Sequence, residues 1–149
     1  MKTVALRFSD SFAPAQGTIL AHCDVIEEVG YVWYGKLGLP LSQKAITYIM
    51  NNDDPMILLI HSGKSERYWA RVSKVQREVP PSLDAIPEYY RNRAEDFKSW
   101  FQIRSITAAS KDILAKCRVL SSGALLGTVS RHSMSPYFII ETEVEGNNG

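Results

Sequence analysis

The chain has few of the residues that build metal and disulfide sites. Its 149 residues include only two cysteines, Cys23 and Cys117, and three histidines, His22, His61 and His132. None of these residues falls in a CxxC or HExxH spacing, so the sequence predicts no metal site and no cofactor. Both cysteines are expected to be buried free thiols.

Long apolar runs are also missing. No stretch approaches the roughly 18 apolar residues that a membrane-spanning helix requires. Residues 1–7 lack the apolar segment and small-residue cleavage site of a signal peptide, so we expect a cytoplasmic protein with no membrane partner. The length and the 45% apolar content are ordinary for one globular domain over residues 1–149, with a polar tail from about residue 143.

The sequence contains no complete catalytic motif. Gly63-Lys64-Ser65 resembles the end of a phosphate-binding loop, but Leu58 occupies the position of the first glycine of that motif. Residues 123–127 begin and end with glycine, yet Leu125 stands where a nucleophile elbow needs serine. We therefore assign no catalytic residue and expect a protein that is not an enzyme.

Charge is nearly balanced overall but unevenly distributed. The net charge of +1 is too small for a protein that coats DNA non-specifically. Residues 64–77 hold five cations and one acid, and residues 97–140 hold six cations and one acid, whereas acids gather at 24–28 and 141–145. This pattern favours a surface with one basic side; the alternative is a set of ordinary solvated strand faces.

Hydrophobic periodicity predicts an α+β domain. Ser42 and Thr18 are predicted helix N-caps, and Gly30 is the predicted stop of the first helix. Residues 79–96 are rich in proline and tyrosine and are predicted to form a long loop, which in compact domains is often functional. The predicted strands are 3–8, 31–34, 56–60, 67–72, 100–106 and 137–140, and the predicted helices are 18–29, 42–50 and 110–118.

Aromatic residues beside cations are the most informative feature. Trp33 and Tyr34 follow the first predicted helix, and Arg67, Trp69 and Arg71 share one face of a predicted hairpin strand. Flat aromatic surfaces next to fixed positive charge suit nucleobases and phosphates. Trp69 either stacks on a flanking base or is covered by the long loop.

In sequence order, the predicted elements and motifs are a helix, Val32-Trp33, a second helix, a hairpin, a loop, a strand and Ser130-Arg131. This order of elements and motifs resembles the YTH and EVE branch of the PUA-like superfamily over about residues 30–140. The resemblance implies a small, curved β-barrel flanked by helices. It also implies DNA or RNA binding in which a modified base, typically a methylated adenine or cytosine, is flipped into an aromatic cage. The implied setting is modification-dependent restriction or defence, with a nuclease or ATPase partner, or else RNA metabolism.

The same resemblance suggests individual site residues. Trp33 matches the cage tryptophan, although a core position is the alternative, and Arg131 matches an arginine that contacts the nucleic-acid backbone. The second cage aromatic of the family lies in the loop before residue 100, where this chain has tyrosines in place of tryptophan. The predicted base pocket consists of Trp33, Tyr34, Ser62, Trp69, Tyr89 and Tyr90. The predicted backbone contacts are Lys36, Arg71, Arg104, Ser130 and Arg131.

Two other functions fit the same residues. The first is an adaptor that uses the barrel to bind a protein or a small molecule without reading nucleic acid. The second is an accessory domain of an RNA-modifying enzyme. A preference for methylated over unmethylated oligonucleotides would distinguish base recognition from both.

Overall fold

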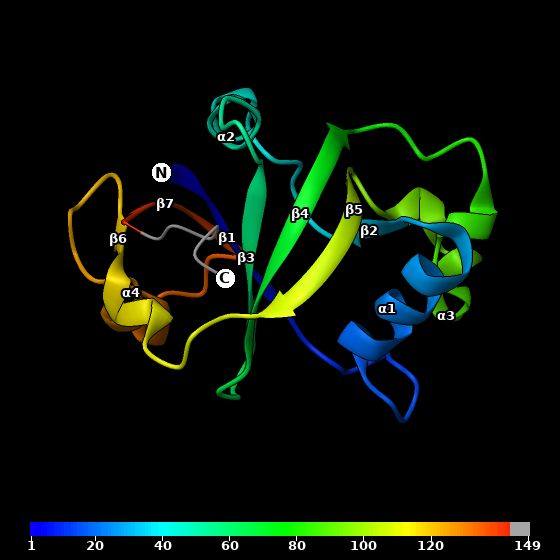
Figure 1. The fold of residues 1–149 in the computed structure, drawn as a ribbon, viewed down its shortest axis with the longest axis horizontal. Helices are drawn as coiled ribbons and strands as arrows, with labels where there is room; N and C mark the ends of the chain where they lie inside the picture. The colour runs from blue at the N-terminus through cyan, green and yellow to red at the C-terminus, as the bar shows by residue number, and fades with distance from the viewer. Residues whose placement is uncertain (144–149) are drawn as a thin grey trace.

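The computed structural model describes residues 1–143, which form a seven-stranded mixed sheet with four α-helices (Figure 1). The strands are β1 (Lys2–Phe8), β2 (Val32–Lys36), β3 (Met56–His61), β4 (Arg67–Gln76), β5 (Ser99–Ala108), β6 (Cys117–Val119) and β7 (Tyr137–Thr142). The α-helices are α1 (Thr18–Val29), α2 (Gln43–Met50), α3 (Glu88–Arg91) and α4 (Leu126–His132). Short 3-10 helices are η1 (Leu83–Ala85), η2 (Ala94–Asp96) and η3 (Ile113–Lys116). The predicted α+β class is confirmed.

The strand order is β2-β5-β4-β3-β1-β7-β6. β1 and β3 are parallel, and the other neighbouring pairs are antiparallel. Register shifts in β4, on either side of Val72, bend the sheet. The end strands β2 and β6 do not pair within residues 1–143, so the predicted closed barrel is wrong. Closure requires the first and last strands to share hydrogen bonds, whereas backbone groups at the outer edge of β2 bond the Tyr90 hydroxyl and β6 has only three residues.

Both faces of the sheet are buried. On β3, Ile57 and Leu59 face the core that lies under α1 and α2, while Leu58 and Ile60 face a second core that lies under η3 and α4. The continuous apolar run at 56–60 predicted this double burial, which is confirmed. In Figure 1, α4, β6 and β7 form the left end of the molecule and α1 and α3 the right end.

The second core corrects two predictions. Trp69 does not lie on a solvent face of β4; it is 7% exposed and packs in the same cluster as Ile113 and Leu126. The segment 110–118 is not one helix, because η3 ends at residue 116 and β6 follows directly. The elements η3, β6 and α4 are too short for their hydrophobic residues to show a recognisable helical or strand periodicity. They cover the face of β4 that carries Trp69, which the alternation of residues along β4 alone would assign to solvent.

The long segment 79–97 is packed rather than extended into solvent. Together with α3, the short helices η1 and η2 form a third hydrophobic cluster, in which Tyr90 and Phe97 meet Trp33 and Trp100. This packing fixes α3 against β2 and β5 and so determines where Tyr89 and Tyr90 point. The predicted polar tail from about residue 143 lies almost entirely outside the described residues.

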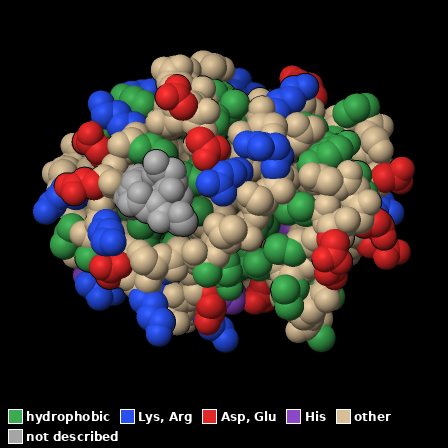
Figure 2. Space-filling view, in the orientation of Figure 1, with side chains coloured by type: hydrophobic (Ala, Val, Ile, Leu, Met, Phe, Trp, Pro, Cys, Tyr) green, Lys and Arg blue, Asp and Glu red, His purple; other side chains and the backbone are tan. Residues whose placement is uncertain are grey.

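Surface charge differs between the two ends of the molecule. Figure 2 shows acidic side chains gathered at the right-hand end, over α1 and α3, and Lys and Arg side chains along the lower left edge. Within residues 1–143, no helix combines the length and the apolar character needed to cross a membrane.

Candidate nucleic-acid interface

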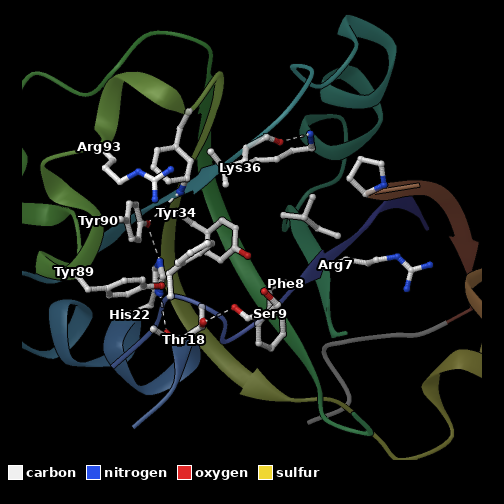
Figure 3. Close-up of a pocket in the computed structure, with 17 residues that line it drawn as sticks. Arg7, Phe8, Ser9, Thr18, His22, Tyr34, Lys36, Tyr89, Tyr90 and Arg93 are labelled. Carbon is white, nitrogen blue, oxygen red and sulfur yellow. Dashed lines mark hydrogen bonds between the residues drawn. The ribbon is translucent and has the colours of Figure 1, made fainter. Parts of the chain in front are cut away.

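A cavity of about 270 Å³ lies between the β1–α1 loop, β2 and α3 (Figure 3). Its volume is just below the range of about 300–1,000 Å³ typical of drug-sized ligands, so it suits one small ring system. Its ring-bearing lining residues are Phe8, Phe12, His22, Tyr34, Tyr89, Tyr90 and Phe97. Its cationic lining residues are Arg7, Lys36 and Arg93, and no Asp or Glu among residues 1–143 lines it.

The pleat of β2 decides which aromatic reaches the cavity. Successive side chains on a strand point to opposite faces, and Tyr34 points into the cavity while Trp33 packs in the third cluster. Trp33 is 5% exposed and does not line the cavity, so the structure places it at the core position that was its alternative. Of the predicted base-pocket residues, Tyr34, Tyr89 and Tyr90 come together here.

Tyr90 connects α3 to the outer edge of β2. Its hydroxyl donates to the Trp33 carbonyl at 3.0 Å and accepts from the Gly35 N–H at 3.2 Å. The same hydroxyl lies 2.9 Å from Nε2 of His22. A buried strand edge needs partners for its backbone groups, and Tyr90 supplies two of them, which makes it primarily a structural residue of the cavity wall.

His22 is a buried histidine that the sequence analysis did not select. Its Nδ1 lies 2.8 Å from the Thr18 carbonyl, which only accepts, so Nδ1 carries the proton of the neutral ring. Nε2 is then an acceptor that shares the single Tyr90 O–H with the Trp33 carbonyl. Burial lowers the pKa of His22 to about 4, although the bond to Thr18 opposes this shift. The ring is therefore neutral at physiological pH. It stacks obliquely on Tyr34 at a centroid distance of 4.9 Å.

Lys36 is a buried cation in the cavity wall rather than an exposed phosphate contact. Its ammonium donates to the carbonyls of Leu37 at 3.1 Å and Leu39 at 2.7 Å, and it lies 5.5 Å from the centre of the Tyr137 ring. Burial lowers its pKa. No carboxylate in residues 1–143 pairs with it, so its charge adds a positive potential to the cavity.

The β1–α1 loop forms the outer rim of the cavity. Thr18 is not the N-cap that was predicted; Gly17 occupies that position, and Asp10 accepts from the Thr18 N–H at 2.9 Å instead. This bond is the main cause of the lowered pKa of Asp10, which also contacts His61 at 2.9 Å. The anchored loop presents Phe12, 72% exposed, with the Arg93 guanidinium 5.6 Å from its ring centre.

A second depression, the basic groove, lies between the β3–β4 turn and α4. It consists of two adjoining hollows that share Arg67, Leu114, Gly127 and Arg131. The cations of this groove are Arg7, Lys64, Arg67, Lys111 and Arg131, and the predicted residues Ser62 and Ser130 also line it. Its one acidic lining residue among residues 1–143 is Asp112, which pairs with Lys116 at 3.7 Å.

The cations of the basic groove have free bonding capacity. Within the described part of the chain, the side chains of Lys111 and Arg131 make no hydrogen bond or ion pair, and Nε of Arg67 is buried without a partner. Arg7 lines both the cavity and the groove, and its guanidinium lies on the groove side, where it donates to the carbonyls of Ser130 and Ser133 at 2.5 and 2.6 Å. The two sites therefore adjoin at Arg7.

Arg71 and Arg104 belong to neither site. Both pair with Asp54, Arg71 at 2.9 Å and Arg104 at 3.8 Å, and neither lines the cavity or the groove. Sequence reasoning missed Phe12 and Arg93, which belong to separate loops and meet only through folding. The sequence signal that could have identified Phe12 is the presence of a large apolar side chain in the otherwise polar loop between β1 and α1.

Gly35 is required by close packing behind the cavity. A Cβ at this position would lie 2.9 Å from Cγ of Phe97 and 3.1 Å from a ring carbon of Trp100. Because both rings are buried, we expect Gly35→Ala to lower the free energy of unfolding by about 1–3 kcal/mol in urea denaturation. Gly127→Ala is the matched control, since its nearest contact would be an ordinary 3.5 Å. Equal stabilities for the two variants would contradict this account.

A family model described as Pua-like matches residues 4–134. No curated protein and no solved structure matches the chain.

Proposed function

The chain belongs to the Pua-like family, and from this premise we propose that it is a non-catalytic nucleic-acid-binding module of the YTH/EVE type. Domains of this family commonly bind nucleic acid. In the proposal, one modified base, methylated and flipped out of a DNA or RNA strand, enters the aromatic cavity. The proposed setting is modification-dependent restriction or defence, beside a nuclease or ATPase, or RNA metabolism.

The observation that carries the proposal is the composition of the cavity. Tyr34 and Tyr89 supply aromatic surface, the volume fits one base, and the charged lining residues among residues 1–143 are all cations. Stacking on an aromatic side chain contributes about 1–3 kcal/mol per base, and a methyl group buried among the rings adds roughly 0.8 kcal/mol. A base taken out of its strand needs this combination of a flat apolar surface and polar groups at its edge.

The basic groove supports the proposal from a second direction. Phosphate contacts position a strand without reading its sequence, and Lys64, Arg67, Lys111 and Arg131 offer such contacts next to the cavity. Arg7 borders both sites, so in this proposal the strand that lies in the groove is the one whose base enters the cavity. This arrangement suits a base that remains part of a polymer.

Filling the cavity tests the proposal. Ala13 lines the cavity on the β1–α1 loop, whereas Ala15, two residues further on, does not. We expect Ala13→Trp to abolish the preference for a methylated over an unmethylated oligonucleotide in fluorescence anisotropy, because the indole occupies the space of the base. Ala15→Trp, the matched control, should retain the preference.

The outcomes separate the candidate functions. A preference that persists in Ala13→Trp would place the base elsewhere and overturn the assignment of the cavity. Failure of the unmodified protein to bind any oligonucleotide at low salt would instead favour an adaptor for a protein or a small molecule.

A further inference from the structure

The Tyr34 hydroxyl opens onto the cavity (Figure 3) and has no hydrogen-bond partner within residues 1–143. The residue is 7% exposed, its ring lies beside His22 and Phe101, and its hydroxyl makes no hydrogen bond with any residue in 1–143. Figure 3 shows the ring reaching into the middle of the cavity. A ligand that displaces water from this hydroxyl without accepting its hydrogen bond would leave the O–H unsatisfied at a cost, so a ligand that fills the cavity is expected to offer it an acceptor.

The other two phenols of the cavity are already engaged. Tyr90 bonds the β2 backbone and His22, and the Tyr89 hydroxyl interacts with the Thr18 side chain. Burial raises the pKa of all three tyrosines, so each is a neutral phenol at physiological pH. Tyr34 is therefore the phenol with an O–H available to a ligand.

The charges around the cavity determine which ligand that O–H meets. Within residues 1–143, Lys36 is buried without a carboxylate partner, and Arg93 at the cavity wall pairs with Asp96 at 3.3 Å. Asp10 does not line the cavity; it acts electrostatically on Tyr34 and Tyr89, but its carboxylate is already engaged by the Thr18 N–H and His61. A positive potential without a lining carboxylate disfavours a cationic ligand and favours one whose edge carries hydrogen-bond acceptors.

Resting on the proposed function, we infer that Tyr34 donates a hydrogen bond to an acceptor on the edge of the methylated base, and that the cavity admits neutral methylated bases while rejecting cationic ones. A base methylated on an exocyclic amine or a ring carbon, such as N6-methyladenine or 5-methylcytosine, stays neutral. A base methylated on a ring nitrogen, such as N1-methyladenine or N3-methylcytosine, carries a positive charge at neutral pH. Tyr34 then acts as a specificity-determining residue.

Isomeric ligands test this inference without a change of size. N6-methyladenine and N1-methyladenine carry the same methyl group at different positions and differ in charge. The ligands are DNA and RNA oligonucleotides that differ only in the central base. That base is N6-methyladenine, N1-methyladenine, 5-methylcytosine, N3-methylcytosine or the corresponding unmodified base. We expect binding of the neutral isomers to be about tenfold tighter or more, because no carboxylate among residues 1–143 lines the cavity to pair with a desolvated cation.

Tyr34→Phe removes the hydroxyl and keeps the ring. We expect it to weaken binding of the neutral methylated bases about five- to tenfold, with a melting temperature equal to or above that of the unmodified protein. Tyr48→Phe, in α2 and outside the cavity lining, is the matched control and should bind normally.

The result distinguishes this inference from the proposed function. Unchanged affinity in Tyr34→Phe, or equal binding of the cationic and neutral isomers, overturns the inference; a methylation preference abolished by Ala13→Trp would still support the proposed function. If the unmodified protein binds methylated and unmethylated oligonucleotides equally, both the inference and the proposed function are overturned.

Discussion

Replacing Arg67 and Arg131 together with glutamine is expected to lower the affinity for a single-stranded oligonucleotide about 25-fold at 0.1 M salt. Each phosphate contact to a single strand contributes about 0.7 to the slope of log affinity against log salt, so removing two contacts flattens that slope by about 1.4. Both residues lie in the shared part of the basic groove, where one strand could contact them together. Anisotropy titrations at several salt concentrations give the slope and the affinity.

The matched control removes the same charge elsewhere. Arg71 and Arg104 both pair with Asp54 outside the groove, so Arg71→Gln with Arg104→Gln should leave the salt slope nearly unchanged. The ratio of affinities for methylated and unmethylated strands should persist in both double variants, because phosphate contacts carry no base information. Equal losses in the two double variants would mean that overall charge, and not the groove, governs binding.

Acidification from pH 6.5 to pH 4 is expected to destabilise the fold by about 3 kcal/mol through His22 alone. Its pKa falls from the ordinary 6.5 to about 4 on folding because the ring is buried. Above pH 6.5, His22 is mostly neutral in both the folded and the unfolded protein, so its contribution to the free energy of unfolding changes little with pH. Between pH 6.5 and 4 the unfolded state binds the proton more readily, so the free energy of unfolding decreases as the pH falls.

A non-titrating variant isolates this effect. Urea denaturation of the unmodified protein and of His22→Gln, followed from pH 7.5 to pH 4, gives the difference between their stabilities at each pH. We expect the unmodified protein to lose its advantage over His22→Gln in this window, since glutamine keeps polar groups near Thr18 and Tyr90 but does not titrate. Parallel curves for the two proteins would show that His22 is not held neutral by burial.

Local pattern was sufficient for the long elements. The helix predicted over 18–29 coincides with α1, and Gly30 ends it with a φ of 100°. Ser42 caps α2 by accepting from the Ala45 N–H at 3.1 Å, as predicted. These features depend on residues within one or two turns of each other, which is the range over which periodicity and capping act.

The site was only partly predictable for a different reason. Tyr34 was selected beside Trp33, and Tyr89 and Tyr90 as tyrosines of the long loop; all three line the cavity, and Ser130 and Arg131 line the groove. Sequence spacing shows that Trp33 and Tyr34 point to opposite faces of a strand, but it does not show which face opens into a cavity. That depends on where segment 79–97 packs, many residues away along the chain.

The sequence by itself therefore determined the α+β elements, the doubly buried strand β3 and the uneven distribution of aromatic and charged residues along the chain, because these depend on composition and local periodicity. Only the tertiary structure decided that the sheet stays open, that Trp69 is core, and that Tyr34 rather than Trp33 reaches the cavity. Each of these outcomes depends on which distant segment covers a given face, and the pleat of a strand, identical on both sides, does not encode that choice.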